Sequence, residues 1–374
     1  MKKFVMLCMV LSLMLSVSAL ADETYYEEYT PLYQAASVLV MCANTGVVIY
    51  ETEGFTRRYP ASITKVMTAL LVLEYVEDLG EYINFSYHAI DIPEYASRMD
   101  MAVGESITVL DALYGIMLRS GNEVTRALAE HVLGSVPAFV ERMNERALEL
   151  GAYDTNFINT CGLPGYGQYV TAYDIALIMQ AALQHPIFVE IISTAEHMLR
   201  PTNLHNYSRL LRNTNRMIHL FDDEFNPYVV GGKTGFTRAA GHTLVTYVRR
   251  DGHEWIITVL YAIERGETFT DTTAIIDYVY ENIDRLMPEP EPEPEPEPVE
   301  DEPTPGPPPS PALPQNPSTV SVQEVQISET VPYERNYAIL TGILVAVLLI
   351  FMLFATAILS LIFILVYRRF VSRR

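Results

Sequence analysis

The segment Pro60-Ala61-Ser62-Ile63-Thr64-Lys65-Val66-Met67-Thr68-Ala69 opens the stretch that constrains the fold most strongly. Leu, Met and Val continue it to about residue 77, which predicts a helix over residues 62–77. Three residues are nearly one helical turn, so Ser62 and Lys65 would lie on one face with their side chains within reach of each other. A serine hydroxyl needs a neighbouring base to act as a nucleophile, and a lysine can be that base when burial and nearby cations lower its pKa. Alone, the pattern also fits a solvent-facing lysine on a helix.

Two further short motifs follow along the chain. Ser120-Gly121-Asn122 lies between two helical patterns and, alone, is typical of a loop or a helix N-cap. Beside the first motif it offers a hydroxyl for proton relay and an amide for binding a peptide carbonyl. Lys233-Thr234-Gly235 ends an apolar run and follows Gly231-Gly232. It is either an ordinary strand end or a carboxylate-binding site. In the second case the lysine charge and the threonine hydroxyl would bind the carboxylate, and the glycine would let a ligand backbone approach.

Lysine is used sparingly in this chain. The sequence contains only Lys2, Lys3, Lys65 and Lys233, and arginine supplies every other basic side chain. Arginine does not give up its proton near neutral pH, whereas lysine can. The two lysines outside the N-terminal segment therefore stand where proton transfer would need them.

Periodicity around the motifs predicts strands at both ends of one domain and helices in its middle. We expect strands over residues 36–43, 47–51, 228–233, 242–249 and 254–263. We expect further helices over residues 110–118, 123–133, 136–150, 172–183 and 268–286. The predicted fold class is α+β, with one antiparallel sheet completed by distant segments and flanked by helices.

Both ends of the chain predict export and attachment to a membrane. A basic start, an apolar run over residues 4–17 and Ala19-Leu20-Ala21 predict a signal peptide over residues 1–21, the alternative being an uncleaved anchor. The folded domain would then span residues 22–287. Glu-Pro repeats predict an extended, disordered linker over residues 288–336. An uncharged run with tyrosines at its edges predicts a transmembrane helix over residues 337–367.

The short tail over residues 368–374 is basic, so it should be cytoplasmic. We therefore expect a single-pass protein of the cell membrane with its domain outside the cytoplasm. The net charge of −21 argues against binding to nucleic acid, which requires a basic footprint. Cys42 and Cys161 could form a disulfide or remain free thiols. Since no metal-ligand spacing of Cys and His occurs, we expect no metal and no cofactor.

Serine-x-x-lysine, Ser-x-Asn and Lys-Thr-Gly in this order are the signature of β-lactamases and penicillin-binding proteins. Over about residues 30–287, the chain resembles the low-molecular-mass penicillin-binding proteins that act as serine-type D-Ala-D-Ala carboxypeptidases, peptidase family S11. Residues 60–69, 118–123, 155–163, 171–174 and 232–241 carry the resemblance. Glu123 stands where the family usually has Asp, and Cys161 where His or Pro is expected. The resemblance implies a β-lactamase/DD-peptidase-like fold with a helical subdomain.

The resemblance also implies roles for the motif residues. Ser62 would attack the carbonyl of the penultimate D-Ala of a peptidoglycan stem pentapeptide, and Lys65 would accept its proton. Ser120 and Lys233 would relay the proton to the leaving D-Ala, and water would resolve the acyl-enzyme. β-Lactam antibiotics would acylate the same serine. The implied substrate-binding residues are Asn122, Lys233, Thr234, Gly235 and Phe236, with the backbone N–H groups of Ser62 and Phe236 as the oxyanion hole.

Several rival functions share these motifs. A class A-like β-lactamase would need a Glu-x-x-Leu-Asn segment between the second and third motifs, and the sequence has none there. A DD-endopeptidase or a transpeptidase on the same fold remains open, as does a penicillin-binding wall module without turnover. The C-terminal part departs from many relatives, in which a small β-rich domain and an amphipathic helix follow the catalytic domain.

Overall fold

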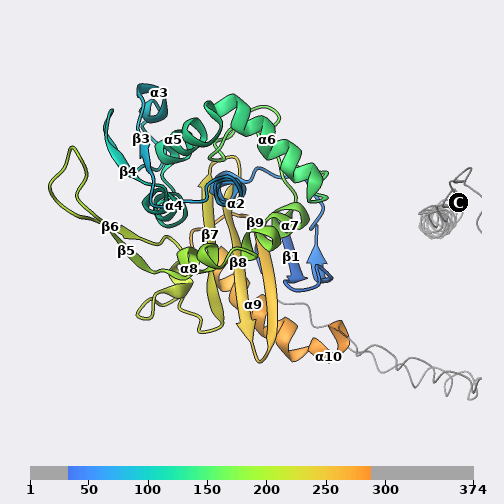
Figure 1. Ribbon diagram of the computed structural model, residues 1–374. Helices are drawn as coiled ribbons and strands as arrows, with labels where there is room; N and C mark the ends of the chain where they lie inside the picture. Colours follow the sequence, from blue (N-terminus) through green and yellow to red (C-terminus); the bar gives the residue numbers. More distant parts are fainter. Residues whose placement is uncertain (1–32, 288–374) are drawn as a thin grey trace, which may run out of the picture. The chain divides into compact units, whose positions relative to one another are not determined.

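The computed structural model describes residues 33–287 of the protein (Figure 1). The signal peptide predicted over residues 1–21, the linker over 288–336, the transmembrane helix over 337–367 and the tail over 368–374 lie outside the described residues. The predicted domain of residues 22–287 is therefore described from Tyr33 onwards.

Five antiparallel strands form the central sheet, in the order β2-β1-β9-β8-β7. Their bounds are Ser37–Cys42 (β1), Val48–Thr52 (β2), Val229–Thr237 (β7), Gly241–Arg250 (β8) and His253–Ala262 (β9). β1 pairs with β9 from Ser37↔Leu260 to Cys42↔Trp255, so the first strand of the domain joins the last. The predicted antiparallel sheet, completed by distant segments, is confirmed.

Side chains on both faces of the sheet are apolar and buried. Because successive side chains of a strand point to opposite faces, Leu39 and Met41 enter one core while Val38 and Val40 enter another. On the first face lie α2 (Lys65–Tyr75), α7 (Ala172–Leu183) and α8 (Pro186–Ser193), and on the second α9 (Glu267–Glu281) and α10 (Ile283–Leu286) (Figure 1). The sheet is thus covered on both sides, which explains why all six residues of β1 are buried.

A helical subdomain adjoins α2. It contains α3 (Tyr87–Ile90), α4 (Val109–Leu118), α5 (Asn122–Leu133) and α6 (Val136–Glu149), together with the short strands β3 (Tyr82–Asn84) and β4 (Ser106–Thr108). A second hairpin, β5 (Glu196–Leu199) and β6 (Arg209–Arg212), packs against α4. The helical middle predicted from periodicity is confirmed. Among the described residues no single helix is long and apolar enough to cross a membrane, and only α7 with α8, bent by 111°, qualify as a pair by length and composition.

Three element boundaries differ from the prediction. The helix expected over 62–77 begins at Lys65, because residues Ala61–Thr64 form a 3-10 turn, η1, entered from a left-handed φ of 50° at Ala61. Strand β7 continues through the third motif to Thr237, since those residues pair with β8. The last helix is interrupted at Asn282, which separates α9 from α10. The short elements α3, α8 and β3 to β6 were not predicted.

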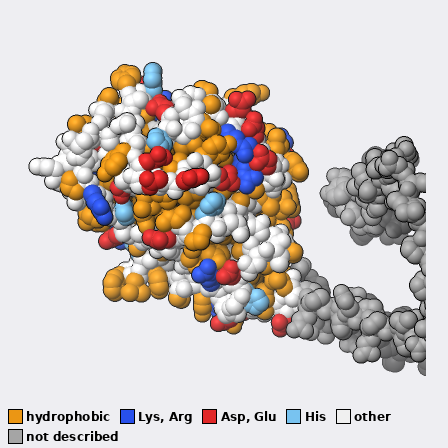
Figure 2. All heavy atoms as spheres, viewed as in Figure 1, with side chains coloured by type: hydrophobic (Ala, Val, Ile, Leu, Met, Phe, Trp, Pro, Cys, Tyr) orange, Lys and Arg blue, Asp and Glu red, His pale blue; other side chains and the backbone are white. Residues whose placement is uncertain are grey.

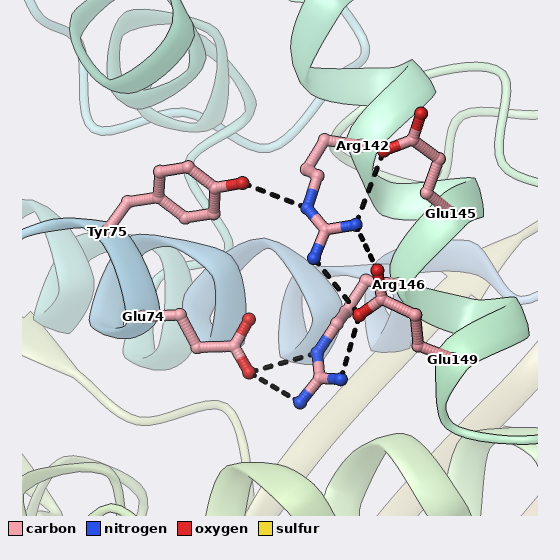
Figure 3. A network of polar contacts seen from close by, with 6 residues as sticks. All are labelled: Glu74, Tyr75, Arg142, Glu145, Arg146 and Glu149. Atoms are coloured by element: carbon pink, nitrogen blue, oxygen red, sulfur yellow. Dashed lines mark hydrogen bonds and ion pairs between the residues drawn. The ribbon is translucent and has the colours of Figure 1, made fainter. Parts of the chain in front are cut away.

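One ion pair and one hydrogen bond join α6 to the end of α2. Arg142 and Arg146 of α6 bind the Glu149 carboxylate, Arg146 also binds Glu74 at 2.8 Å, and Arg142 donates to the Tyr75 hydroxyl at 2.9 Å (Figure 3). The hydrogen bond from Arg142 lowers the pKa of Glu149 to about 2. Acidic and basic side chains consequently lie side by side over α6 (Figure 2). The network therefore contacts α2 at the end opposite Lys65, the first residue of that helix.

Candidate active site

Ser62 and Lys65 meet where η1 passes into α2. The Lys65 Nζ lies 3.0 Å from the Ser62 Oγ. Lys65 is completely buried, and Nζ also donates to the Asn122 Oδ1 at 2.7 Å and to the Cys161 carbonyl at 2.9 Å. Burial lowers the pKa of Lys65 to about 8, although the nearby Cys161 and Glu123 act in the opposite direction. A substantial fraction of Lys65 is therefore neutral near physiological pH and able to accept a proton.

The turn that carries Ser62 is tightly constrained. Ala61 has a φ of 50°, in the left-handed region that a residue with a side chain rarely adopts. Gly162 packs directly against it, since a Cβ on Gly162 would lie 1.7 Å from the Ala61 carbonyl oxygen. Strain of this kind persists only where the surroundings enforce it, and it concentrates at functional sites.

Ser120 lies two residues before α5 and lines the same cavity as Ser62. It also has a left-handed φ, 62°, and only 6% of the residue is exposed. Its hydroxyl has no hydrogen-bond partner among the described residues. A buried hydroxyl without a partner is costly, so the unused Ser120 Oγ is available to a ligand or to a proton in transit. Asn122 follows, already bound to Lys65.

The third motif lies on β7, at the edge of the sheet. Lys233 is 1% exposed, and its Nζ donates to the Thr234 carbonyl at 2.8 Å. Burial and the positive charge of Lys65 lower the pKa of Lys233 well below its usual range. The Thr234 hydroxyl shares a 2.6 Å hydrogen bond with the hydroxyl of Thr214. The two motif lysines are therefore close enough for the charge of one to affect the protonation of the other.

Gly235 brings β7 against the nucleophile. A Cβ at this position would lie 2.4 Å from the Thr243 Oγ1 and 2.8 Å from the Ser62 backbone nitrogen. Only a glycine fits there, and it places the neighbouring Phe236 at the cleft. Among the described residues β7 pairs with β8 alone, so its outer edge can accept an extended peptide as an added strand.

Two cavities of about 530 Å³ each meet at Ser62. The first is lined by Asn122, by the loop around Cys161 and by residues 236–239. The second is lined by Ser120, Thr234, Thr214, Arg216 and Arg265, and is the more cationic. Ser62 thus stands at the centre of a cleft with two chemically different sides.

Six of the eight predicted site residues line these two cavities: Ser62, Ser120, Asn122, Thr234, Gly235 and Phe236. Lys65 and Lys233 are buried behind this lining, Lys65 in contact with Ser62 and Asn122, and Lys233 with the carbonyl of Thr234. Sequence reasoning missed the Cys161 carbonyl and Thr214. Nothing in the residues around Thr214 marks it, because its role depends on its place opposite Thr234. Cys42 and Cys161 are buried free thiols, so they form no disulfide. Within the described range, residues 33–287, no His, Cys, Asp or Glu cluster could hold a metal.

Known proteins resemble this chain over the same region. The family model described as D-alanyl-D-alanine carboxypeptidase, Peptidase_S11, matches residues 25–263. D-alanyl-D-alanine carboxypeptidase DacF of Bacillus subtilis is 32% identical over 256 residues, which cover 67% of this chain and 64% of the relative. D-alanyl-D-alanine endopeptidase of Escherichia coli is 29% identical over 253 residues, covering 67% of this chain and 78% of the relative.

Solved structures agree with these relatives. The Streptomyces K15 DD-transpeptidase superposes with a TM-score of 0.62 and 28% identity, covering 67% of this chain and 99% of that one. The D-alanyl-D-alanine carboxypeptidase of Mycobacterium tuberculosis H37Rv gives a TM-score of 0.61 and 27% identity, covering 67% and 92%. The predicted penicillin-binding, DD-peptidase-like α+β fold is confirmed.

Proposed function

Since the chain belongs to the S11 family of D-alanyl-D-alanine carboxypeptidases, we propose that it removes the terminal D-alanine from peptidoglycan stem pentapeptides through an acyl-enzyme on Ser62. The matched region spans less than two thirds of the Bacillus relative, 64% of its length. The observation that carries the proposal is the 3.0 Å contact between the Ser62 hydroxyl and a completely buried Lys65 amine.

Acylation begins with proton transfer from the Ser62 hydroxyl to the neutral Lys65 amine. The Ser62 Oγ bonds to the carbonyl carbon of the penultimate D-Ala, and the carbonyl oxygen becomes an oxyanion facing the backbone N–H groups of Ser62 and Phe236. The peptide C–N bond then breaks as its nitrogen takes a proton, which Lys65 supplies through Ser120 with the help of Lys233. Free D-alanine departs and leaves an ester on Ser62.

Deacylation returns the enzyme to its starting state. Water adds to the ester carbonyl and transfers a proton to the protein, and the C–O bond to Ser62 breaks as its oxygen regains a proton. A β-lactam presents the same carbonyl chemistry, but its leaving group stays tethered to the acyl group. The protein should therefore be sensitive to penicillin.

Substrate binding follows from the two sides of the cleft. A terminal carboxylate would lie beside the Lys233 amine and the hydrogen-bonded hydroxyls of Thr234 and Thr214, one of which can donate to it while the other donates within the pair. Binding of this anion would favour the protonated form of Lys233 and so restore its charge. Asn122 would receive the amide of the acyl part, while the outer edge of β7 pairs with the stem backbone.

We further propose that this chemistry takes place outside the cytoplasm, in cell-wall biogenesis and remodelling. Sequence composition supports this: a signal-like segment over residues 1–21, a Glu-Pro-rich spacer over 288–336 and an uncharged stretch over 337–367. The spacer would hold the domain away from a membrane crossed by the C-terminal stretch, with the basic tail in the cytoplasm.

Mass spectrometry of the domain after exposure to penicillin tests the nucleophile. One adduct should appear on the peptide that contains Ser62, and Ser62→Ala should carry none. Incubation with a pentapeptide should release D-alanine and leave the tetrapeptide. Cleavage of a cross-linked stem dimer without this release would instead assign a DD-endopeptidase, the activity named for the Escherichia coli relative. Labelling without turnover of either substrate would leave only a penicillin-binding module.

A further inference from the structure

The direction of β7 fixes which part of a stem peptide meets which side of the cleft, if the proposed function holds. Lys233 and Thr234, which would hold the terminal carboxylate, come first along the strand. Gly235 then touches the backbone of Ser62, where the scissile carbonyl must lie. The stem must therefore run antiparallel to β7, and the residue before the D-Ala-D-Ala lies towards residues 237–239.

The cavity at that end of β7 is largely apolar. Its lining includes Tyr95, Ala96, Leu163, Pro164, Phe236 and Ala239. Arg238 is its only charged lining residue, and no acidic side chain lines it. A cationic side chain of the stem would find no counter-charge here, whereas an anionic one would find a guanidinium.

Arg238 is free to bind a ligand. It is exposed and makes no hydrogen bond or ion pair with any residue in the range 33–287. Arg216, in the other cavity, differs in this respect because its guanidinium lies 2.7 Å from carboxylate oxygens of both Asp222 and Glu224. A guanidinium presents five N–H donors in a geometry that matches a carboxylate bidentately, and all five are unused in Arg238.

We propose that Arg238 makes this enzyme selective for stems in which the residue before D-Ala-D-Ala ends its side chain in a carboxylate rather than a bare amine. The carboxylate gains a charge-assisted pair at the rim of an apolar cavity, and the amine meets a like charge instead. Both effects favour the same substrate class. We expect a preference of about tenfold in kcat/KM, since a partly exposed ion pair contributes only modestly.

A matched peptide series tests this selectivity. The substrates are Nα-acetyl-X-D-Ala-D-Ala, in which X is L-2-aminopimelate, L-lysine or L-norleucine. The first two carry a carboxylate or an amine on four methylene groups, and the third carries neither. Release of D-alanine is measured at about 0.15 M salt, where long-range attraction by the acidic protein is screened. The unmodified protein should cleave the aminopimelate peptide fastest and the lysine peptide slowest.

Two variants and one control assign the effect to Arg238. Arg238→Gln should reduce the preference to about twofold or less, and Arg238→Glu should reverse it in favour of lysine. Arg200→Gln changes the net charge equally at an exposed arginine that lines neither cavity, and should retain the preference. Acylation by a fluorescent penicillin checks that each variant is folded.

The outcomes separate this inference from the proposed function. Equal cleavage of all three peptides, or a preference that survives in Arg238→Gln, overturns the role of Arg238 while leaving the carboxypeptidase intact. No release of D-alanine from any peptide by the unmodified protein overturns the proposed function, and the selectivity with it.

Discussion

The pH dependence of acylation tests whether Lys65 is the base. With its pKa at about 8, about one tenth of Lys65 is neutral at pH 7, whereas an ordinary lysine with a pKa of 10.5 would be about 0.03% neutral. Burial therefore raises the reactive fraction about 300-fold, which corresponds to about 3 kcal/mol of the activation barrier. The acylation rate should rise about tenfold per pH unit below pH 8 and level off above it.

The assay is the second-order rate constant of labelling by a fluorescent penicillin, measured from about pH 6 to about pH 9.5. Lys65→Arg keeps the positive charge but cannot release a proton in this range, so the rate should fall by about 10²- to 10⁴-fold at every pH. Ser62→Ala serves as the unlabelled control. A rate independent of pH, a rate that still rises about tenfold per pH unit at the alkaline end of the range, or a Lys65→Arg variant within tenfold of the unmodified protein would refute the assignment.

Three further substitutions have distinct expected results. Gly235→Ala forces a Cβ against Thr243 and the Ser62 backbone, so kcat/KM should fall about 100-fold. An unchanged circular dichroism spectrum together with an unchanged kcat/KM would contradict this. Ser120→Ala removes a buried hydroxyl that has no partner among the described residues, so acylation should slow about 100-fold while the Tm stays level or rises; a large drop in Tm would contradict this. Glu149→Gln should lower the Tm at neutral pH, and the difference should shrink as the pH falls from 4.5 towards 2, since the stabilisation from a lowered carboxylate pKa is lost on protonation. A Tm difference that is constant over that range would show that the ion pairs do not act through the charge of Glu149.

Much of the fold could be predicted because its main elements have strong periodicity. The strands over 242–249 and 254–263 and the helices over 110–118, 123–133 and 172–183 lie within a few residues of the observed bounds. The short strands β5 and β6 were not predicted, because each has only four residues and exposes both polar and apolar side chains. Their existence depends on Leu199 and Leu211, which are buried against α4, and that contact is not visible in the local pattern.

The candidate site was predictable for a different reason. Its side chains stand in compact motifs whose residue types limit the chemistry they can perform. The remaining contributors are backbone or contact features: the Cys161 carbonyl that binds Lys65, the left-handed turn at Ala61, and Gly162 packed against it. A carbonyl belongs to every residue, so sequence cannot single one out. The predicted start of the helix at Ser62 was wrong because the 3-10 turn is imposed by these neighbours.

The lowered pKa of Lys65 depends on the side chains and backbone that pack around its amine. Lys65 is shielded from water in part by the segment around Cys161, whose carbonyl binds its amine. Two hydrogen bonds hold this segment. The Asn159 Oδ1 accepts from the Gly162 backbone N–H at 2.7 Å, and the Thr160 carbonyl accepts from the Thr68 hydroxyl at 2.7 Å. If this segment opened, water would reach the amine, and the pKa of Lys65 would return towards its ordinary value. The neutral fraction at pH 7 would then fall by up to about 300-fold without any part of the sheet unfolding. Catalytic activity should therefore be lost at a lower denaturant concentration than the folded structure. It depends on the contacts of the segment around Cys161, which can open locally while the sheet stays folded.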